Sequence, residues 1–463
     1  MKKLSFIFIL YFLGLSACNF LDEKPEDFLS PANFYQSEAD AEAAIIAAYD
    51  ELGYYLSNMW EIGGITADLL EPGAGAPQSR LELQTYSYDP TQGDLNSLWR
   101  NVYQGINIAN TAIDQIGPSG LDADIVDPLI GEAKFLRALY YFDLARIFGD
   151  VPLLTSETSS LGNLQVSRSP QSEVYQQVVN DLEDAIELLP ESRPGSQTGR
   201  ATTGAALALL TKVQLYRGEY QAAASAAEQV MAQGYALMPI EELWDPAFEN
   251  GPEHIFSVQY LAGVQGSNLN ELFGVRGAPS PYTGFSAAWV DESFANSFAE
   301  EDQRKPVSIL EVYINRDGDT VDIEPHVLKY FNPDGPSPGD TDTDWPVIRY
   351  ADILLMYAEA LNNVNNGPNA AAYDAVNQVR ARAGVGPLPA GLGQAAFSDA
   401  LLQERAWELC FEGHRWFDLR RFDQLVPVMN AYGQPIQAPK HLLFPIPQRE
   451  LDVNNELSQN PDY

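Results

Sequence analysis

Residues that build metal centres and disulfide frameworks are scarce in this sequence. Among 463 residues there are two cysteines, Cys18 and Cys410, and four histidines. Two cysteines cannot make a disulfide framework or a four-cysteine metal site. The histidines show neither HExxH spacing nor a neighbouring Cys/His cluster, and the chain has no GxSxG or GxxxxGK(S/T) motif. Zinc hydrolysis, catalysis by a nucleophile elbow and phosphate-loop nucleotide binding therefore have no support in the sequence.

Positive charge is also scarce. Lysine and arginine total 27, against 64 aspartates and glutamates, which gives a formal net charge of −37. A surface this acidic repels phosphate backbones and anionic lipid, so we expect no nucleic-acid partner and no docking on membranes through a basic face. A glycan hydrolase needs only two carboxyl groups at a suitable separation. With 64 acidic residues such pairs are inevitable, so they carry no information by themselves.

The N-terminus lacks a run long enough to span a bilayer. The apolar run Leu4–Leu15 is shorter than the roughly 20 residues that a spanning helix takes, and it follows Lys2 and Lys3. This pattern is typical of a signal peptide, and the small residues before Cys18 suit cleavage by a lipoprotein signal peptidase. We predict a lipoprotein signal peptide at residues 1–17 and a membrane anchor through lipidated Cys18. An ordinary signal peptide is the alternative.

Residues 18–37 are predicted to form the lipidated N-terminus and a tether. Acidic residues at 22, 23, 26 and 27 follow the cysteine closely. With Cys18 lipidated, Cys410 has no partner for a disulfide. Because Cys410 lies in a helical apolar pattern, we expect it in the hydrophobic core rather than in a reactive site.

Residues 38–463 are predicted to form a single, mainly α domain. The pattern indicates a tetratricopeptide-like array of helix pairs, at about 38–235 and 346–425, with long loop insertions and a few short strands. The predicted helices span residues 39–52, 95–116, 131–148, 170–189, 202–216, 220–232, 351–362 and 369–383. The repeats keep no fixed period of about 34 residues, so the array is degenerate rather than a regular solenoid.

Two stretches interrupt the helical pattern. Residues 53–96 are rich in Gly, Pro, Tyr and polar residues, and residues 244–345 contain short alternating runs at 255–260 and 307–315. We interpret both as long loops with a few short strands. Loops this long on a helical scaffold are uncommon unless they are functional or disordered, and their aromatic content argues against disorder.

Two acidic motifs in the second stretch are candidate calcium sites. They are Asp317-Gly318-Asp319 and the alternating Asp340, Asp342 and Asp344. Neither has the full calcium-loop spacing with a closing glutamate. A solvated acidic loop is the simpler interpretation, so no cofactor is predicted, and calcium stays an alternative.

Longer motifs are spread along the body of the chain. The first runs from Glu132 to Leu154 and reads EAKFLRALYYFDLARIFGDVPLL. The second is RYADILLMYAEALN at 349–362, followed by NQVRARAG at 377–384.

A third motif covers the C-terminal part of the chain. It begins with Glu404-Arg405 and continues as EGHRWFDLR at 412–420, PIP at 445–447 and QNPDY at 459–463. In this order, and together with the lipidation motif and the acidic tether, the three motifs resemble the SusD/RagB family of nutrient-binding outer-membrane lipoproteins. The resemblance spans nearly the whole chain, except the two long loop regions.

The resemblance implies both a fold and a biological role. The fold would contain four tetratricopeptide-like helix pairs and carry no catalytic activity. The protein would sit lipid-anchored on the cell surface, at the outer membrane, and cap a partner TonB-dependent transporter. It would capture a glycan, or in some members a peptide, and hand it to that transporter. A surface-anchored glycan hydrolase is the rival interpretation, which the missing catalytic motifs and the helical body disfavour.

Charged residues within these motifs alternate in sign inside apolar helices. They are Arg349, Glu359, Arg380, Glu404, Arg405, Glu412, Arg415 and Asp418. We expect them to form ion pairs and hydrogen bonds between packed helices rather than to contact ligand, because buried charges require partners. Trp99 and Trp416 lie in helical patterns and are likewise expected in the core.

Ligand binding is therefore expected on the loops. A saccharide presents apolar C–H faces, which stack on aromatic rings, and hydroxyl groups, which need polar partners. The candidate ligand-binding residues, chosen by residue type and by their place in the loops, are Trp60, Arg80, Tyr86, Tyr282, Phe285 and Trp345. No catalytic and no metal-binding residue is predicted, and the sequence leaves open whether the ligand is a glycan or a peptide.

Overall fold

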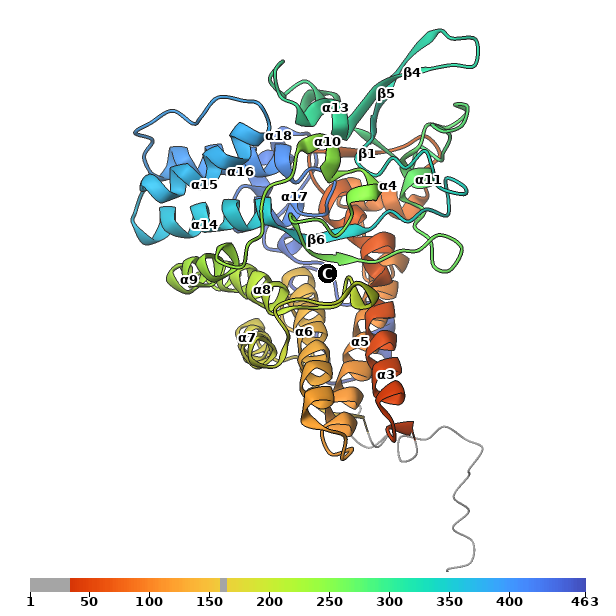
Figure 1. Ribbon diagram of the computed structural model, residues 1–463. Helices are drawn as coiled ribbons and strands as arrows, with labels where there is room; N and C mark the ends of the chain where they lie inside the picture. The colour runs from red at the N-terminus through yellow and green to blue at the C-terminus, as the bar shows by residue number, and fades with distance from the viewer. Residues whose placement is uncertain (1–33, 159–164) are drawn as a thin grey trace, which may run out of the picture.

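The structure is a computed structural model in which residues 34–158 and 165–463 are described. Helices dominate it, with a few short strands, which confirms the predicted mainly α fold (Figure 1). The predicted signal peptide, Cys18 and the tether up to residue 33 lie outside the described residues. Within the described part of the chain, no helix combines the length and the apolar character that crossing a bilayer requires.

The eight helices predicted from the sequence are all present. Their bounds are α3 Glu38–Asp50, α5 Gly93–Ile116, α6 Ala123–Phe148, α7 Gln171–Leu188, α8 Thr203–Tyr216, α9 Tyr220–Met231, α14 Tyr350–Val364 and α15 Ala370–Arg382. The C-terminal part adds α16 Gln394–Glu408, α17 Arg415–Arg421, α18 Leu425–Ala431 and α19 Gln448–Val453. α6 starts at Ala123, before its predicted beginning at Gly131, and that glycine lies inside the helix. A Cβ there would come within 3.0 Å of the Leu188 Cβ, so the glycine lets the end of α7 approach α6.

Local sequence explains where several helices begin and end. At the start of α3 the Ser37 hydroxyl accepts a hydrogen bond from the Asp40 N–H at 3.3 Å, and the Asp40 carboxylate accepts one from the Ser37 N–H at 3.0 Å. This reciprocal capping box satisfies amide groups that the helix itself leaves unpaired. The turn between α8 and α9 contains Gly218 at φ +74°, a left-handed conformation that glycine adopts without strain.

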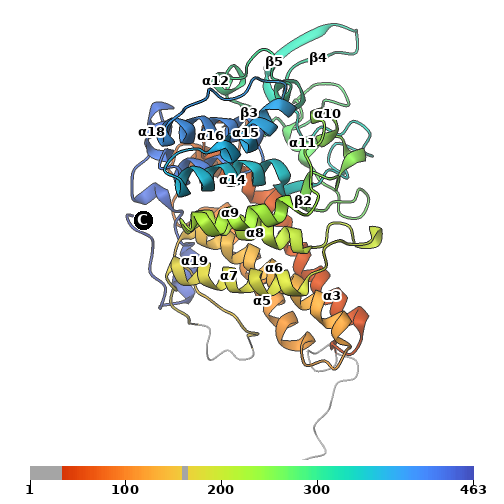
Figure 2. The same cartoon turned by 60° about the vertical axis from the view of Figure 1, so that its left-hand side comes forward.

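The helices form one continuous stack. α3, α5 and α6 lie side by side, and α7 packs against both α6 and α8. In Figure 2, α7, the α8–α9 pair and α14 lie in successive layers. α9 contacts α14 directly, so the array continues in space although more than a hundred residues separate the two helices in sequence. Ala223 and Ala227 on α9 are fully buried, and small side chains of this kind allow helices to approach closely.

The chain between α9 and α14 holds most of the strands. The strands are β1 Leu70–Pro72, β2 His254–Val258, β3 Ala288–Val290, β4 Ile309–Ile314, β5 Thr320–Val327 and β6 Trp345–Arg349. They pair antiparallel as β1–β3, β2–β6 and β4–β5. β4 falls within one of the two alternating runs predicted from the sequence, and β2 overlaps the other but begins one residue before it. The β4–β5 hairpin projects from the helical body at the upper right of Figure 1.

The fold also contains short helical segments, some of which lie between these strands. They are α10 Ile240–Leu243, α11 Leu269–Phe273, α12 Glu292–Ala295, α13 Arg304–Ser308 and the single turns η1 Glu51–Gly53, η5 Gly195–Gln197, η6 Pro246–Phe248 and η7 Lys440–Leu442. Within residues 244–345, the predicted long loop is therefore a chain of short elements held against the helical stack.

Residues 53–96 are not the long surface loop that their composition predicted. They contain two buried π-helical turns, η2 Tyr55–Met59 and η3 Glu61–Ile65, followed by α4 Gln78–Gln84. A Cβ on Gly63 would lie 2.1 Å from the carbonyl oxygen of Gly413, so only glycine permits this approach of two backbones. The glycines that suggested a loop instead allow tight packing against the C-terminal part of the chain.

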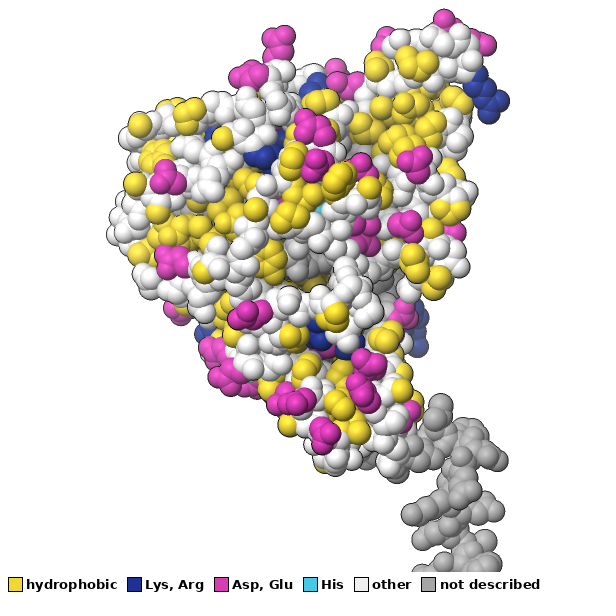
Figure 3. Space-filling model, in the orientation of Figure 1, with side chains coloured by type: hydrophobic (Ala, Val, Ile, Leu, Met, Phe, Trp, Pro, Cys, Tyr) yellow, Lys and Arg dark blue, Asp and Glu magenta, His cyan; other side chains and the backbone are white. Residues whose placement is uncertain are grey.

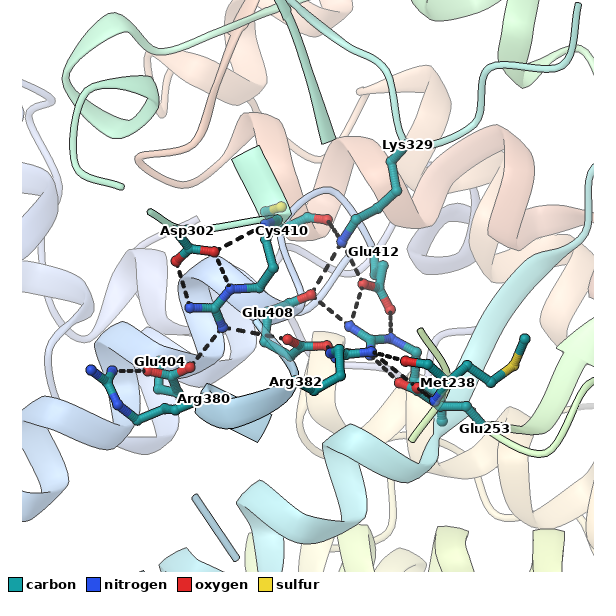
Figure 4. Close-up of polar contacts among 12 residues, drawn as sticks. Met238, Glu253, Asp302, Lys329, Arg380, Arg382, Glu404, Glu408, Cys410 and Glu412 are labelled. Atoms are coloured by element: carbon teal, nitrogen blue, oxygen red, sulfur yellow. Dashed lines mark hydrogen bonds and ion pairs between the residues drawn. The ribbon is translucent and has the colours of Figure 1, made fainter. Parts of the chain in front are cut away.

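The charged residues of the helical motifs pair with one another in the core, as predicted. Arg349 donates to both oxygens of Glu412, at 2.8 and 2.9 Å, and also pairs with Glu253 at 2.7 Å and Glu408 at 2.5 Å. Lys329 adds a 2.8 Å bond to Glu412 (Figure 4). The structure supplies the partners of the remaining residues, which the sequence did not specify: Arg380–Glu404, Arg405–Asp418, Arg421–Glu359 and Arg415–Asp68. Trp99, Trp416 and Cys410 are also buried, as expected.

Candidate functional site

A cavity of about 680 Å³ opens beside the base of the β4–β5 hairpin. Its wall is formed by Glu241, residues 244–247, Tyr282, Pro306, Val307, Leu310, Leu328 and residues 331–335, with Asp342 at one side. On the face drawn in Figure 3, hydrophobic side chains gather near the base of this hairpin, with acidic side chains around them. The size lies within the range of about 300–1,000 Å³ that is usual for small-molecule sites, so the cavity is the candidate binding site.

Aromatic rings form one side of this cavity. Tyr282 and Phe331 stack with 5.2 Å between ring centroids and 8° between planes, and Tyr313 lies 5.8 Å from Tyr282. The backbone of Tyr282 is fixed because its carbonyl accepts the Val275 N–H at 2.7 Å and its N–H donates to Pro279 at 3.0 Å. The Tyr282 ring is therefore held in place as a partly exposed apolar surface at the cavity wall.

Trp244, directly after α10, supplies another ring. Its indole is half-buried, and the ammonium of Lys329 lies 4.4 Å from the ring centroid, with the Arg349 guanidinium at 5.6 Å. Tyr330 meets the ring edge-on at 6.0 Å. Both cations also bind Glu412 in a buried ion-pair network, in which Figure 4 shows Lys329 pointing toward Glu412. The network thus fixes Trp244 through cation–π contacts in a water-poor environment.

Polar groups complete the wall of the cavity. Asn332, Glu241, Asp245, Asp334 and Asp342 all line it. Asn332 is buried, and its side-chain oxygen accepts the Asp334 N–H at 3.2 Å. The four carboxylates are exposed, and they offer acceptors to a ligand that brings hydroxyl donors. Rings beside polar acceptors suit a saccharide, which has both apolar faces and hydroxyl groups.

Two carboxyl groups with raised pKa, those of Glu249 and Asp344, lie near the cavity in sequence, two residues after the lining residues Ala247 and Asp342. Glu249 accepts the Asp344 N–H at 2.9 Å, and Asp344 accepts the Tyr260 N–H at 2.8 Å and the Asn250 amide at 3.2 Å. Burial, together with nearby acids, raises the pKa of Glu249 to about 8; burial also raises the pKa of Asp344 to about 7, despite its hydrogen bonds. Carboxyls of this kind are candidate general acids. Here they fasten backbone segments to each other, and neither lines the cavity.

In the acidic motifs that were candidate calcium sites, side chains accept hydrogen bonds from backbone N–H groups. Asp342 accepts the Ala262 N–H at 2.7 Å, and Asp340 accepts the Gly263 N–H at 3.0 Å. The 317–319 motif lies in the β4–β5 turn, where the Asn315 side chain accepts two backbone N–H bonds. Across residues 34–158 and 165–463, no group of three or more His, Cys, Asp or Glu side chains is arranged to hold a metal ion.

The structure separates the six candidate ligand-binding residues. Tyr282 lines the cavity. Phe285 is 49% exposed but lies outside the cavity wall. Arg80 donates to Glu61 at 2.7 and 2.8 Å, and its guanidinium lies 4.8 Å from the Trp60 ring centroid. Its charge is therefore already engaged by a carboxylate, although part of the side chain stays accessible.

Trp60, Tyr86 and Trp345 lie in the core, so the expectation that they are exposed stacking platforms is wrong. Trp60 meets Phe273 edge-on at 5.3 Å, and Trp345 stacks on Tyr330 at 5.4 Å. The Tyr86 hydroxyl donates to a backbone carbonyl inside the protein. The physical reason is that other segments pack over each ring in the folded chain, which leaves no face for a ligand.

Trp244 and Phe331 were missed as candidate site residues. Both lie at or inside the predicted loop region 244–345, and both are aromatic, so residue type alone did not distinguish them from the chosen rings. The sequence contained a pattern that could have identified them: Glu241 and Asp245 lie within three residues of Trp244, and Asp334 lies three residues after Phe331. That combination of aromatic and polar residues is what a saccharide site requires.

Comparisons with known proteins agree with this architecture. Residues 19–215 match a family model described as starch-binding and associating with the outer membrane, and residues 287–463 match the model of the SusD family. SusD-like protein P2 of Formosa agariphila is 30% identical, with 100% of both chains covered. The chain therefore belongs to the SusD/RagB family, as its motifs indicated.

Solved structures show the same likeness. A laminarin binding SusD-like protein has a TM-score of 0.84 and 29% identity, covering 93% of this chain and 100% of that one. A SusD superfamily protein from Parabacteroides distasonis has a TM-score of 0.85 and 28% identity, covering 92% of this chain and 99% of that one. The fold is thus shared along nearly the full length of both relatives.

Proposed function

We propose that this protein is a glycan-binding protein of the outer membrane that captures a polysaccharide or oligosaccharide at the cavity around Trp244 and Tyr282. The observation that carries the proposal is the combination, in one cavity, of the Trp244, Tyr282 and Phe331 rings with Asn332 and exposed carboxylates. Rings bind the C–H faces of sugars, and polar groups bind their hydroxyls. The similarity to a laminarin binding SusD-like protein supports the same ligand class.

The proposal includes binding without cleavage. The sequence has no catalytic motif, and the two carboxyls with raised pKa accept backbone hydrogen bonds outside the cavity wall. We further propose that lipidated Cys18 anchors the protein at the cell surface and that it delivers its glycan to a partner TonB-dependent transporter. The lipoprotein pattern at residues 1–18 and the membership of the SusD/RagB family support this part.

Retention in native gels that contain polysaccharide tests the binding site. Wild-type protein should be retarded by at least one neutral polysaccharide, and Trp244→Ala should lose most of that retardation. Trp407→Ala is a matched control, because Trp407 is also half-buried and has a guanidinium, that of Arg304, 5.9 Å from its ring centroid, but it lies outside the cavity. Equal retardation of wild type and Trp244→Ala would show that the glycan binds at a site that does not include Trp244.

The same preparations test the absence of cleavage and the ligand class. The chain length of the retained polysaccharide should not change during long incubation with the protein. Oligosaccharides that accumulate in proportion to purified protein would establish a hydrolase instead. Binding of peptides with no retention by any glycan would favour the peptide alternative.

Purification tests the transporter partnership. The full-length protein, extracted from outer membranes in mild detergent, should copurify with a TonB-dependent transporter in a stable ratio. Recovery of the protein alone, from membranes that contain the transporter, would contradict delivery through a lasting complex.

A further inference from the structure

The charges around the cavity are of one sign. Glu241, Asp245, Asp334 and Asp342 line it with exposed carboxylates, and its described lining residues include no lysine or arginine. The whole chain adds to this field, with a formal net charge of −37. This feature bears on which glycans the proposed site accepts, so the inference rests on the proposed function.

The cations nearest to the cavity are already engaged. Lys329 and Arg349 lie behind the Trp244 ring, and both are buried. Their charges are satisfied by Glu412, which accepts bonds from Lys329 at 2.8 Å and from Arg349 at 2.8 and 2.9 Å. Lys305, next to the cavity wall, pairs with Glu311 at 3.0 Å. An incoming sulfate or carboxylate would therefore find no free ammonium or guanidinium in this wall.

The physical consequence is discrimination by charge. A sulfated or uronate-bearing chain would lose part of its hydration on entering the cavity and would meet like charges there, with no cation to compensate. A neutral chain meets no such penalty, since its hydroxyls donate to the same carboxylates while its C–H faces stack on Trp244 and Tyr282. The exposed carboxylates act through water, so the repulsion should be strongest at low ionic strength.

We propose that the cavity selects neutral polysaccharides and rejects sulfated and uronate-bearing ones. The aromatic wall supplies attraction that does not depend on charge, and the surrounding carboxylates supply the repulsive element that makes binding selective. Specificity of this kind depends on penalising the wrong ligand as well as on contacts with the right one.

Matched polymers test this selection directly. A panel of neutral polysaccharides that includes laminarin is compared with the sulfated derivative of each, at equal chain length and with EDTA present to exclude bridging by divalent ions. The dissociation constant of wild-type protein for the sulfated form should exceed that for the neutral form by at least about tenfold in low salt. The ratio should shrink toward one in 0.5 M sodium chloride.

A pair of variants separates the cavity from the general charge of the protein. Glu241→Gln combined with Asp334→Asn removes two cavity charges, and it should lower the ratio of the two dissociation constants by severalfold. Glu300→Gln combined with Asp374→Asn makes the same change in charge at exposed positions outside the cavity, and it should leave the ratio near the wild-type value.

The outcomes distinguish this inference from the proposed function. Equal or tighter binding of the sulfated forms overturns the charge selection while glycan binding stands. An equal response of the two double variants also overturns it, because the discrimination would then come from net charge rather than from the cavity. If no polysaccharide of either kind binds, the proposed function fails and the inference fails with it.

Discussion

The rings of Tyr282 and Phe331 stack with 5.2 Å between centroids and 8° between planes. Tyr282 comes from the segment before β3, and Phe331 follows β5, so the contact joins two distant parts of the chain at the cavity wall. Because Phe331 holds the tyrosine ring, a saccharide meets an ordered surface and loses less free energy in ordering the site.

Tyr282→Ala should weaken glycan binding with little effect on stability. Loss of one aromatic stacking contact typically costs about 0.5–1.5 kcal/mol of binding free energy, in addition to the loss of buried apolar area. We therefore expect the dissociation constant to rise about tenfold. Tyr282→Phe keeps the ring and should retain most of the affinity. Calorimetric titration with a polysaccharide that wild-type protein binds measures both variants. If Tyr282→Ala binds like wild type, stacking at this ring is not part of the site.

Trp60→Ala and Trp345→Ala should destabilise the protein. Both rings are buried, and truncating a buried tryptophan typically costs about 3–5 kcal/mol because it removes apolar contacts and leaves a void. Urea unfolding followed by circular dichroism should show a lower midpoint for both variants. Variants that keep the wild-type midpoint but lose glycan binding would show instead that these rings contact ligand.

Glu412→Ala should also destabilise the protein. Its carboxylate pairs with buried Arg349 and Lys329, and although burial opposes ionisation, these two cations lower the pKa of Glu412. Removing one member of a buried ion pair typically costs about 3–5 kcal/mol because the remaining charge is left uncompensated.

An exposed ion pair gives the control for Glu412→Ala. Glu311 pairs with Lys305 at 3.0 Å, and its side chain is 44% exposed. Exposed pairs are worth about 0–1 kcal/mol, so Glu311→Ala should shift the urea midpoint far less than Glu412→Ala does. Similar shifts in the two variants would contradict a buried network that stabilises the core.

Stability should fall as the pH rises through the neutral range. Burial raises the pKa of Glu249 to about 8 and that of Asp344 to about 7, above the ordinary carboxyl values of about 4. Around pH 7 to 8, above the range where histidines of the unfolded chain titrate, these two carboxyls bind more protons in the folded state than in the unfolded chain, so the free energy of unfolding decreases as pH increases.

Asp344→Asn should reduce this dependence on pH. The asparagine cannot ionise, so the decline in Tm between pH 7 and pH 8.5 should be smaller than in wild type, as measured by scanning calorimetry. Asp374→Asn, at an exposed position on α15, is the control and should follow wild type. Parallel curves for wild type and Asp344→Asn would mean that this carboxyl contributes nothing to the dependence.

Cys18→Ala should abolish lipid labelling and release the protein from membranes. The prediction follows from the apolar run Leu4–Leu15 and the small residues before Cys18. Labelling with radioactive palmitate, followed by membrane fractionation, measures both effects. Cys410→Ala is the matched control, because Cys410 is buried and should not be acylated. Unchanged labelling of Cys18→Ala would contradict the anchor.

Helices and core ion pairs were predictable because their signals are local. Apolar spacing sufficed to locate α7 within residues 170–189 and to separate α8 from α9. Alternating charges in apolar helices, such as Arg349 and Glu412, indicated buried pairs, since an unpaired charge in a core is too costly to tolerate. These features depend on a helix's own periodicity or on the general cost of desolvation.

Only the tertiary structure decided which loop rings face solvent. Trp60 and Trp345 are as aromatic as Trp244, but Phe273 and Tyr330 cover them, while Trp244 keeps part of its ring at a cavity. Composition likewise suggested a loop at 53–96. In the structure the helical turn that contains Gly63 is buried, because the glycine lets its backbone pack directly against that of Gly413. The sequence by itself determined the helical scaffold, the family and the need for the motif charges to be paired, while the structure decided their partners. Exposure of a ring depends on tertiary contacts with other segments, such as that of Trp60 with Phe273, and no local pattern encodes those contacts.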